Sequence, residues 1–310
     1  DTYMSQKPGE VDALACVTGK PVTQGGVRGR REATGLGVYF GIREVCNMAE
    51  VMKKLGLEPG VEGKTVVVQG LGNVGFYSAK YLSEAGAKVI GIAEWNGGIF
   101  DEKGINVEAL KKYQNQTGGF KGYGSGEFIE KSKELLTYPC DILIPAALEN
   151  QITKENAARI QAKIIGEAAN GPVTQEAERI LNENGKMIIP DMYLNAGGVT
   201  VSYFEWLKNL SRVSFGKLEK RYDQEKYRKL LGTIENATGE EFTDEEKEQL
   251  IQGASERDLV LSGLEETMVN AYHAMNKVRQ EKNIKSLRTA GFILALERIS
   301  VSYMDLGIFP

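Results

Sequence analysis

An apolar segment that runs directly into a glycine-rich turn is the feature that most constrains the fold of this chain. Residues 64–69 (KTVVVQ) lead into residues 70–75 (GLGNVG), and a second apolar segment, residues 88–93, ends at the acid Glu94. A strand, a GxGxxG turn, a helix, a second strand and an acid about 20 residues after the turn are the fingerprint of a dinucleotide-binding βαβ unit. The sequence therefore predicts two neighbouring parallel strands, with the turn and Glu94 at the same edge.

The three glycines of the turn have different expected roles. Gly70 allows the strand to turn sharply, and Gly72 allows the backbone to approach a pyrophosphate. Gly75 allows the following helix, residues 74–84, to pack close to the strand. The phosphates would then face N–H groups at the helix N-terminus, where the macrodipole is positive. A GxGxxG turn alone also occurs without a ligand, but the flanking strands and helix here favour a dinucleotide site.

Glu94 indicates which dinucleotide is preferred. Its carboxylate can accept hydrogen bonds from both hydroxyl groups of an adenosine ribose, whereas a 2′-phosphate at that place would meet a like charge. NAD is therefore the preferred cofactor, and NADP stays possible.

The rest of the first two hundred residues alternates between strand and helix patterns. This alternation predicts an α/β fold, a doubly wound, Rossmann-like and mostly parallel sheet with helices on both faces. Right-handed crossovers then place the ligand crevice at the carboxyl ends of the strands. The expected strands are 64–69, 88–93, 141–144, 163–166 and 187–189, and the expected helices are 33–55, 74–84, 106–115, 153–160 and 173–183.

The segment 217–248 has a different character, because 17 of its 32 residues are charged. Such a segment cannot be buried inside a domain. A thin apolar stripe and a capping-box pattern at residues 243–246 predict two short helices that project into solvent or pack on a sister subunit. A second capping pattern at residues 255–258 opens a long helix to about residue 283, and a last helix covers roughly 285–303.

Composition excludes several classes of function. The formal net charge is −4 and no stripe of lysine and arginine stands out, so nucleic acid is not an expected partner. No apolar run approaches the length that spans a membrane, so no membrane association is expected. Three widely spaced cysteines suggest neither disulfides nor a zinc site, and a single histidine, His273, removes most catalytic triads and histidine-metal centres. No metal site is therefore predicted.

Five longer motifs lie along the chain: residues 20–35, 70–75, 142–147 (ILIPAA), 168–172 (AANGP) and 190–206 (PDMYLNAGGVTVSYFEW). Together they resemble the glutamate dehydrogenases of the glutamate, leucine, phenylalanine and valine dehydrogenase family. The resemblance extends over essentially the whole chain and implies oxidative deamination of L-glutamate to 2-oxoglutarate and ammonium, and the reverse reaction, with NAD or NADP. Leucine, valine or phenylalanine as the substrate stays open.

The resemblance also implies which residues line the site. The side chains of Val199 and Ser202 match residues that contact the amino-acid substrate. Carboxamide side chains can hold the nicotinamide ribose and ring amide, and small residues let the ring lie against backbone. The implied cofactor-binding residues are Arg30, Thr34, Gly70, Gly72, Asn73, Val74, Gly75, Glu94, Ala147, Asn170 and Asn195.

The resemblance further implies the domain organisation. The charged segment matches the protruding antenna of animal-type and ciliate-type hexameric enzymes, so a homo-oligomer, a hexamer, in the mitochondrial matrix is expected, with the cytoplasm as the other location. The expected parts are a remnant of the substrate and oligomerisation domain (1–19), the dinucleotide-binding domain (20–207), an antenna-like helical hairpin (208–253), and the pivot and C-terminal helices (254–310).

No catalytic residue is assigned within this chain. In the family, the lysines that bind the substrate carboxylate and the aspartate that moves protons lie upstream of the segment that residues 1–3 match. Residues 118–122 (GGFKG) superficially resemble the lysine loop but follow a helix of the sheet domain. We therefore expect the chain to be the coenzyme-binding half of an enzyme and inactive alone. The alternative is a free-standing dinucleotide-binding module without catalysis.

Overall fold

The computed structural model describes residues 2–6, 9–10, 12–211, 217–251 and 254–307, with the side chains of 217–223 and 249 left out. The chain divides into two compact units. Unit 1 comprises Asp1–Arg30 and Val199–Leu264, and unit 2 comprises Arg31–Gly198 and Glu265–Pro310.

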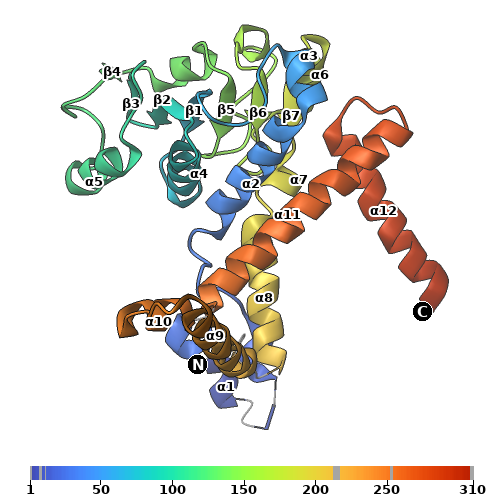
Figure 1. Ribbon diagram of the computed structural model, residues 1–310. Helices are drawn as coiled ribbons and strands as arrows, with labels where there is room; N and C mark the ends of the chain where they lie inside the picture. The colour runs from blue at the N-terminus through green and yellow to red at the C-terminus, as the bar shows by residue number, and fades with distance from the viewer. Residues whose placement is uncertain (1, 7–8, 11, 212–216, 252–253, 308–310) are drawn as a thin grey trace. The chain divides into compact units, whose positions relative to one another are not determined.

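Unit 2 is built on a seven-stranded sheet with the order β4-β3-β2-β1-β5-β6-β7, which Figure 1 shows side by side. The parallel strands are β2, β1, β5, β6 and β7. At the β2 edge, β3 pairs with β2 and β4 pairs with β3, both in antiparallel orientation. The expected doubly wound, mostly parallel sheet is thereby confirmed. The strands are β1 Thr65–Gln69, β2 Lys88–Glu94, β3 Gly97–Phe100, β4 Glu127–Ile129, β5 Ile142–Pro145, β6 Ile164–Gly166 and β7 Met187–Ile189.

The central strands form the core of unit 2. Residues 66–68 of β1 and 142–144 of β5 are fully buried, as near-continuous apolar runs are when helices cover both faces of a parallel sheet. Helix α4 packs against both α2 and α5. The helices that lie wholly in unit 2 are α2 Ala33–Asn47, α3 Ala49–Leu55, α4 Asn73–Glu84, α5 Val107–Thr117, α6 Gln175–Glu183, α7 Asp191–Leu194 and α12 Leu287–Leu306, with 3₁₀ turns at Ser132–Thr137 and Ala157–Arg159.

Two expected helices differ in the structure. The helix expected over 33–55 is interrupted at Met48, whose extended backbone ends α2 and begins α3. The helix expected over 153–160 is wrong, because only the short 3₁₀ turn forms there. The Asn156 side chain accepts a hydrogen bond from the Thr153 N–H (2.8 Å) and donates one to the Gln151 carbonyl (2.9 Å). These side-chain bonds compete with the helical hydrogen-bond ladder.

Unit 1 contains the charged segment. Its helices are α1 Thr2–Gln6, 3₁₀ turns at Ala13–Cys16 and Val22–Gln24, most of α8 Gly197–Ser211, α9 Lys217–Thr238, α10 Asp244–Ile251 and the start of α11 Glu256–Glu281. Helices α9 and α10 pack together, and α10 begins with a capping box. The Thr243 N–H donates to Glu246 Oε2 (2.9 Å), and the Glu246 N–H donates to Thr243 Oγ1 (3.3 Å). Residues 212–216 and 252–253 of the expected antenna-like hairpin (208–253) lie outside the described residues.

A search of the helices in the described ranges finds none with the length and apolar character needed to cross a bilayer.

Candidate functional site

The glycine turn lies between β1 and α4, and its three glycines differ in their surroundings. Gly70 has φ +89°, which a side chain rarely adopts. A Cβ built on Gly75 would lie 1.9 Å from the Gly70 carbonyl oxygen, so only glycine lets α4 approach the turn this closely. A Cβ built on Gly72 would have no neighbour within 4 Å. The open side of the turn is thus at Gly72, which also precedes the first turn of α4 without a capping side chain.

Glu94 ends β2 beside this turn. Its Oε1 accepts a hydrogen bond from the Leu71 N–H (2.6 Å) and one from Gln114 Nε2 of α5 (3.3 Å). Lys111, one helical turn earlier on α5, donates to the Leu71 carbonyl (2.6 Å) and to Gln114 Oε1 (2.8 Å). The carboxylate is therefore held in place from two sides and carries a cation close by.

Lys111 and Gln114 are site residues that sequence reasoning missed. Their spacing of three places them on one face of a helix, but nothing in that spacing shows which strand the face meets. Burial lowers the pKa of the Lys111 ammonium. The Glu94 carboxylate opposes this shift, and the Arg31 guanidinium adds to it.

A cleft of about 730 Å³ opens at this edge of the sheet. Gly70, Glu94 and Ala147 line it, together with Trp95 and Lys131, which the sequence did not suggest. Trp95 is 89% exposed. Three of the implied cofactor residues thus border one cavity of a size that suits a small ligand.

The start of α2 lies against the same turn. Asn73 Nδ2 donates to the Arg31 carbonyl (2.8 Å), so this side chain connects α4 to the segment that precedes α2. A Cβ on Gly35 would come within 2.9 Å of the Val74 carbonyl oxygen, which shows how closely the two helices approach. Thr34, next to Gly35, is half-buried there.

Asn170 and Asn195 meet at the carboxyl ends of β6 and β7. Asn195 Nδ2 donates to Asn170 Oδ1 over 2.7 Å. The loop after β5 is bonded to the same region, since the Asn150 N–H donates to the Gly171 carbonyl (2.9 Å). The loops that follow β5, β6 and β7 therefore form one continuous rim, with Ala147 and the two asparagines on it.

The remaining implied residues lie in unit 1. Arg30 Nε donates to Ser202 Oγ over 3.0 Å, which joins the end of the N-terminal segment to α8. Val199, one turn earlier on α8, is 72% exposed. Arg30 and Ser202 are thus brought together, although 172 residues separate them in the sequence.

Glu205 of α8 is a buried charge in unit 1 to which the sequence assigned no role. Its side chain forms an ion pair with Lys20 (2.9 Å) and accepts hydrogen bonds from the Gly19 N–H (3.0 Å) and the Lys20 N–H (3.2 Å). Burial raises the pKa of Glu205, but these three partners outweigh it and the net shift is downward. Glu205 therefore stabilises unit 1 above the ordinary carboxyl pKa of 4.5 and ceases to do so as the pH falls through its lowered value.

We expect Glu205→Gln to lower the free energy of unfolding by about 2 kcal/mol at pH 7, because a charged acceptor of backbone N–H groups is lost. The difference should shrink as the pH falls below 4.5 and through the lowered pKa of Glu205. Urea unfolding over a series of pH values from 7 downward measures it, with the exposed Glu240→Gln as the matched control in unit 1. Equal stability of Glu205→Gln and the unsubstituted protein at pH 7 would contradict this role.

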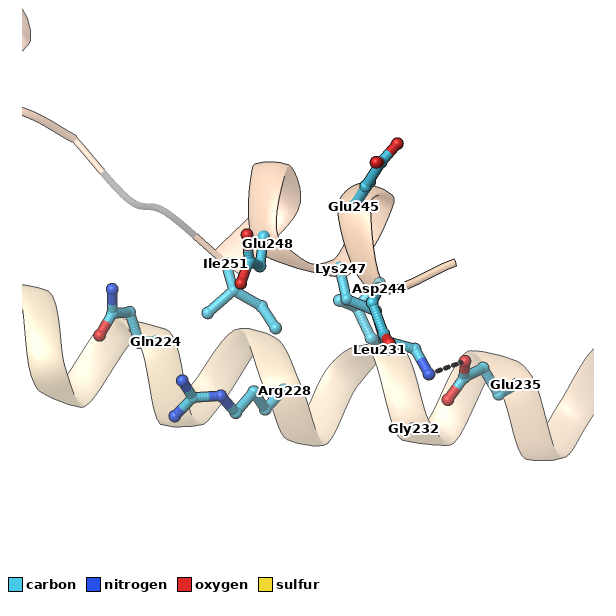
Figure 2. A pocket seen from close by; sticks show the side chains of 10 residues that line it. All are labelled: Gln224, Arg228, Leu231, Gly232, Glu235, Asp244, Glu245, Lys247, Glu248 and Ile251. Atoms are coloured by element: carbon cyan, nitrogen blue, oxygen red, sulfur yellow. Dashed lines mark ion pairs between the residues drawn. The ribbon is translucent and has the colours of Figure 1, made fainter. Parts of the chain in front are cut away.

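Unit 1 also contains a hollow of about 930 Å³ between α9 and α10, shown in Figure 2. Arg228, Glu235 and Lys247 are among its charged lining residues, and Leu231 and Ile251 are its buried apolar ones. The ion pair between Lys247 and Glu235 (2.9 Å) closes one end. None of the implied cofactor or substrate residues lines this hollow. Within the described part of the chain, no group of three or more His, Cys, Asp or Glu side chains is arranged so that it could hold a metal ion.

Comparison with known proteins agrees with this geometry. The sequence model of the glutamate/leucine/phenylalanine/valine dehydrogenase family matches residues 25–259. A mitochondrial glutamate dehydrogenase of Dictyostelium discoideum is 51% identical over 307 residues, covering 99% of this chain and 61% of that protein. A glutamate dehydrogenase of Thermotoga maritima is 40% identical over 311 residues, covering 100% of this chain and 62% of that protein.

Solved structures give the same result. The glutamate dehydrogenase of Peptoniphilus asaccharolyticus is 30% identical with a TM-score of 0.69, over 99% of this chain and 61% of that one. The hetero-hexameric glutamate dehydrogenase of Thermus thermophilus, in a leucine-bound form, is 25% identical with a TM-score of 0.73, over 100% of this chain and 61% of that one. The chain thus spans about three fifths of the length of these relatives. The family model matches most of the chain, and the glycine turn and the acid that ends β2 agree with it. The chain therefore belongs to the glutamate/leucine/phenylalanine/valine dehydrogenase family.

Proposed function

We propose that this chain supplies the coenzyme-binding part of an NAD(P)-dependent glutamate dehydrogenase, with NAD preferred. The reaction is the oxidative deamination of L-glutamate to 2-oxoglutarate and ammonium, and its reverse. The observation that carries the proposal is the turn of Gly70, Gly72 and Gly75 beside Glu94, with open space at Gly72 and a cleft at the same edge. This arrangement fits a dinucleotide, because the backbone can approach its pyrophosphate and a fixed carboxylate faces its ribose.

The residues of unit 2 then have distinct tasks. The N–H groups at the start of α4 bind the phosphates, and Glu94 binds the adenosine ribose. Asn170 and Asn195, already hydrogen-bonded to each other, hold the carboxamide and ribose of the nicotinamide end. A coenzyme held there would supply the acceptor for the hydride that leaves the α-carbon of the amino acid. In unit 1, Val199 and Ser202 contact the side chain of the substrate.

The proposal extends to the parts of the enzyme beyond this site. Binding of the substrate carboxylate and proton transfer are assigned to lysines and an aspartate that precede the matched segment in the family. The domains, the antenna at 208–253, a homo-hexamer and the mitochondrial matrix belong to the same proposal. A mitochondrial relative supports the mitochondrial location, and a hetero-hexameric structural relative supports an assembly of six subunits but not their identity.

Coenzyme binding and turnover test the proposal separately. Binding is measured by titrating the 310-residue chain, and the longest natural polypeptide that contains it, with NADH and NADPH while following nicotinamide fluorescence. Turnover is measured in the same two proteins as NADH oxidation with 2-oxoglutarate and ammonium. We expect binding in both and turnover in the longer one. Binding without turnover in either would indicate a binding module, and faster turnover of a branched or aromatic 2-oxo acid would indicate another substrate. Failure to bind NADH would contradict the proposal.

Glu94 is expected to set the preference between the two coenzymes. Glu94→Gln keeps an oxygen for the Leu71 N–H but removes the charge that repels a 2′-phosphate, and it leaves the Lys111 ammonium without its facing anion. The ratio of NADH to NADPH affinity should fall by about tenfold, or about 1.4 kcal/mol.

Fluorescence titration with both coenzymes measures this ratio. Glu130→Gln is the matched control, because it removes the same charge from another part of the cleft lining. An unchanged ratio in Glu94→Gln, or an equal fall in Glu130→Gln, would show that Glu94 does not face the ribose.

A further inference from the structure

Arg288, in the first turn of α12, binds three carboxylates that come from three different elements. Its Nε donates to Glu178 Oε2 of α6 (2.8 Å), its Nη1 to Asp191 Oδ1 of α7 (2.6 Å), and its Nη2 to Glu167 Oε2, directly after β6. Each nitrogen of the guanidinium therefore has its own acid. The planar fork of the guanidinium spreads these bonds over three nitrogens, which the single nitrogen of a lysine ammonium cannot do.

Two of these acids in turn hold the loops at the carboxyl ends of β6 and β7. Glu167 Oε2 accepts a hydrogen bond from the Asp191 N–H (2.8 Å), and Asp191 Oδ2 accepts one from the Gly171 N–H (2.8 Å). Asn170 directly precedes Gly171, and the Asn195 N–H donates to the Asp191 carbonyl (3.1 Å). Through this network of hydrogen bonds, Arg288 is linked to the two loop segments that carry the asparagines of the rim.

Arg288 supplies the positive charge that compensates the carboxylates of this network. Glu167 is fully buried, and its Oε1 has no hydrogen-bond partner among the described residues. The pKa of Glu167 is raised to about 7, because burial and the Asp191 carboxylate raise it by more than Arg288 and the Asp191 N–H lower it. Without Arg288 the three guanidinium hydrogen bonds that join Glu178, Asp191 and Glu167 would be lost, and the loops after β6 and β7 would no longer be held at a fixed distance.

We propose that Arg288 is a positioning residue for the nicotinamide end of the coenzyme. It acts through Glu167 and Asp191, which set the distance between the loops that carry Asn170 and Asn195. The assignment rests on the proposed function. It does not concern the adenosine end, because Glu94 and the glycine turn are held by β1, β2 and α5 through a separate set of hydrogen bonds.

Comparison of a whole coenzyme with its adenosine half tests this proposal. NADH carries the nicotinamide, whereas ADP-ribose has the same adenosine and pyrophosphate without it. We expect Arg288→Met to bind NADH about tenfold more weakly and ADP-ribose with unchanged affinity. Arg298→Met, an exposed arginine on the same helix, is the matched control and should bind both as the unsubstituted protein does. Calorimetric titration of each nucleotide into the unsubstituted protein and the two variants gives the six affinities.

Two further variants keep the test decisive if Arg288→Met does not fold. Arg288→Lys keeps a positive charge but not the fork, and the double variant Glu167→Gln with Arg288→Met removes the buried acid together with its partner. Both should show the same selective loss of NADH affinity as Arg288→Met. Circular dichroism and thermal unfolding establish that each variant is folded.

The outcomes separate this proposal from the function on which it rests. An NADH affinity that is unchanged in all folded Arg288 variants overturns the positioning role alone. An equal loss for NADH and ADP-ribose also overturns it, because that result indicates a general structural role. If the unsubstituted protein binds neither nucleotide, the proposed function fails and the assignment of Arg288 fails with it.

Discussion

Replacement of Gly75 by alanine is expected to destabilise unit 2 by about 3 kcal/mol, the upper end of the usual cost of overpacking. The added Cβ would lie 1.9 Å from the Gly70 carbonyl oxygen and 2.9 Å from the Gly70 carbonyl carbon, and both atoms belong to the backbone of the turn. The clash cannot be relieved by rotating a side chain. Either α4 moves away from β1 or the turn changes shape, and each change removes the geometry on which coenzyme binding depends.

Urea unfolding followed by circular dichroism measures this effect. Gly124→Ala is the matched control, because Gly124 is exposed and a Cβ there would have no neighbour within 4 Å. The control should stay within about 0.5 kcal/mol of the unsubstituted protein. A Gly75→Ala variant as stable as Gly124→Ala would show that the close approach of α4 to the turn is not a feature of the folded protein.

Gly72→Ala is expected to have the opposite pattern, with binding lost and stability retained. The backbone of Gly72 has φ −70°, which alanine adopts without strain, and the space around its Cβ is open. A methyl group there would occupy the side of the turn from which a pyrophosphate approaches. We expect NADH affinity to fall by about a hundredfold, or about 2.7 kcal/mol, while the free energy of unfolding changes by less than about 0.5 kcal/mol.

Titration of Gly72→Ala with NADH and with free adenosine separates the two contributions to binding. Adenosine has no phosphate, so its affinity should be the same in Gly72→Ala and in the unsubstituted protein. Unchanged NADH affinity would place the pyrophosphate elsewhere. A parallel loss for adenosine would mean that the methyl group distorts the cleft rather than blocking the phosphates.

The dinucleotide fold was predictable because its signals are local. Apolar runs such as Val66–Val68, the spacing of the glycines and the acid at Glu94 all lie within about thirty residues, and a βαβ unit of that length folds in one handedness. The two antiparallel strands, β3 and β4, were not predicted. β3 begins with two glycines and β4 with Glu127, so neither has the continuous apolar run of β5, β6 and β7. The pairing of β3 with β2 and of β4 with β3 is a tertiary event.

The sequence by itself determined the turn, the core strands and the capping boxes, since each depends on residues that are neighbours along the chain. Only the tertiary structure decided which side chains hold the site. Lys111 and Gln114 reach the turn and Glu94 because α5 packs beside α4, and Arg288 meets acids that lie 97 to 121 residues earlier. The physical reason is that a guanidinium binds whichever carboxylates the fold places within reach, and packing, not sequence spacing, sets that distance.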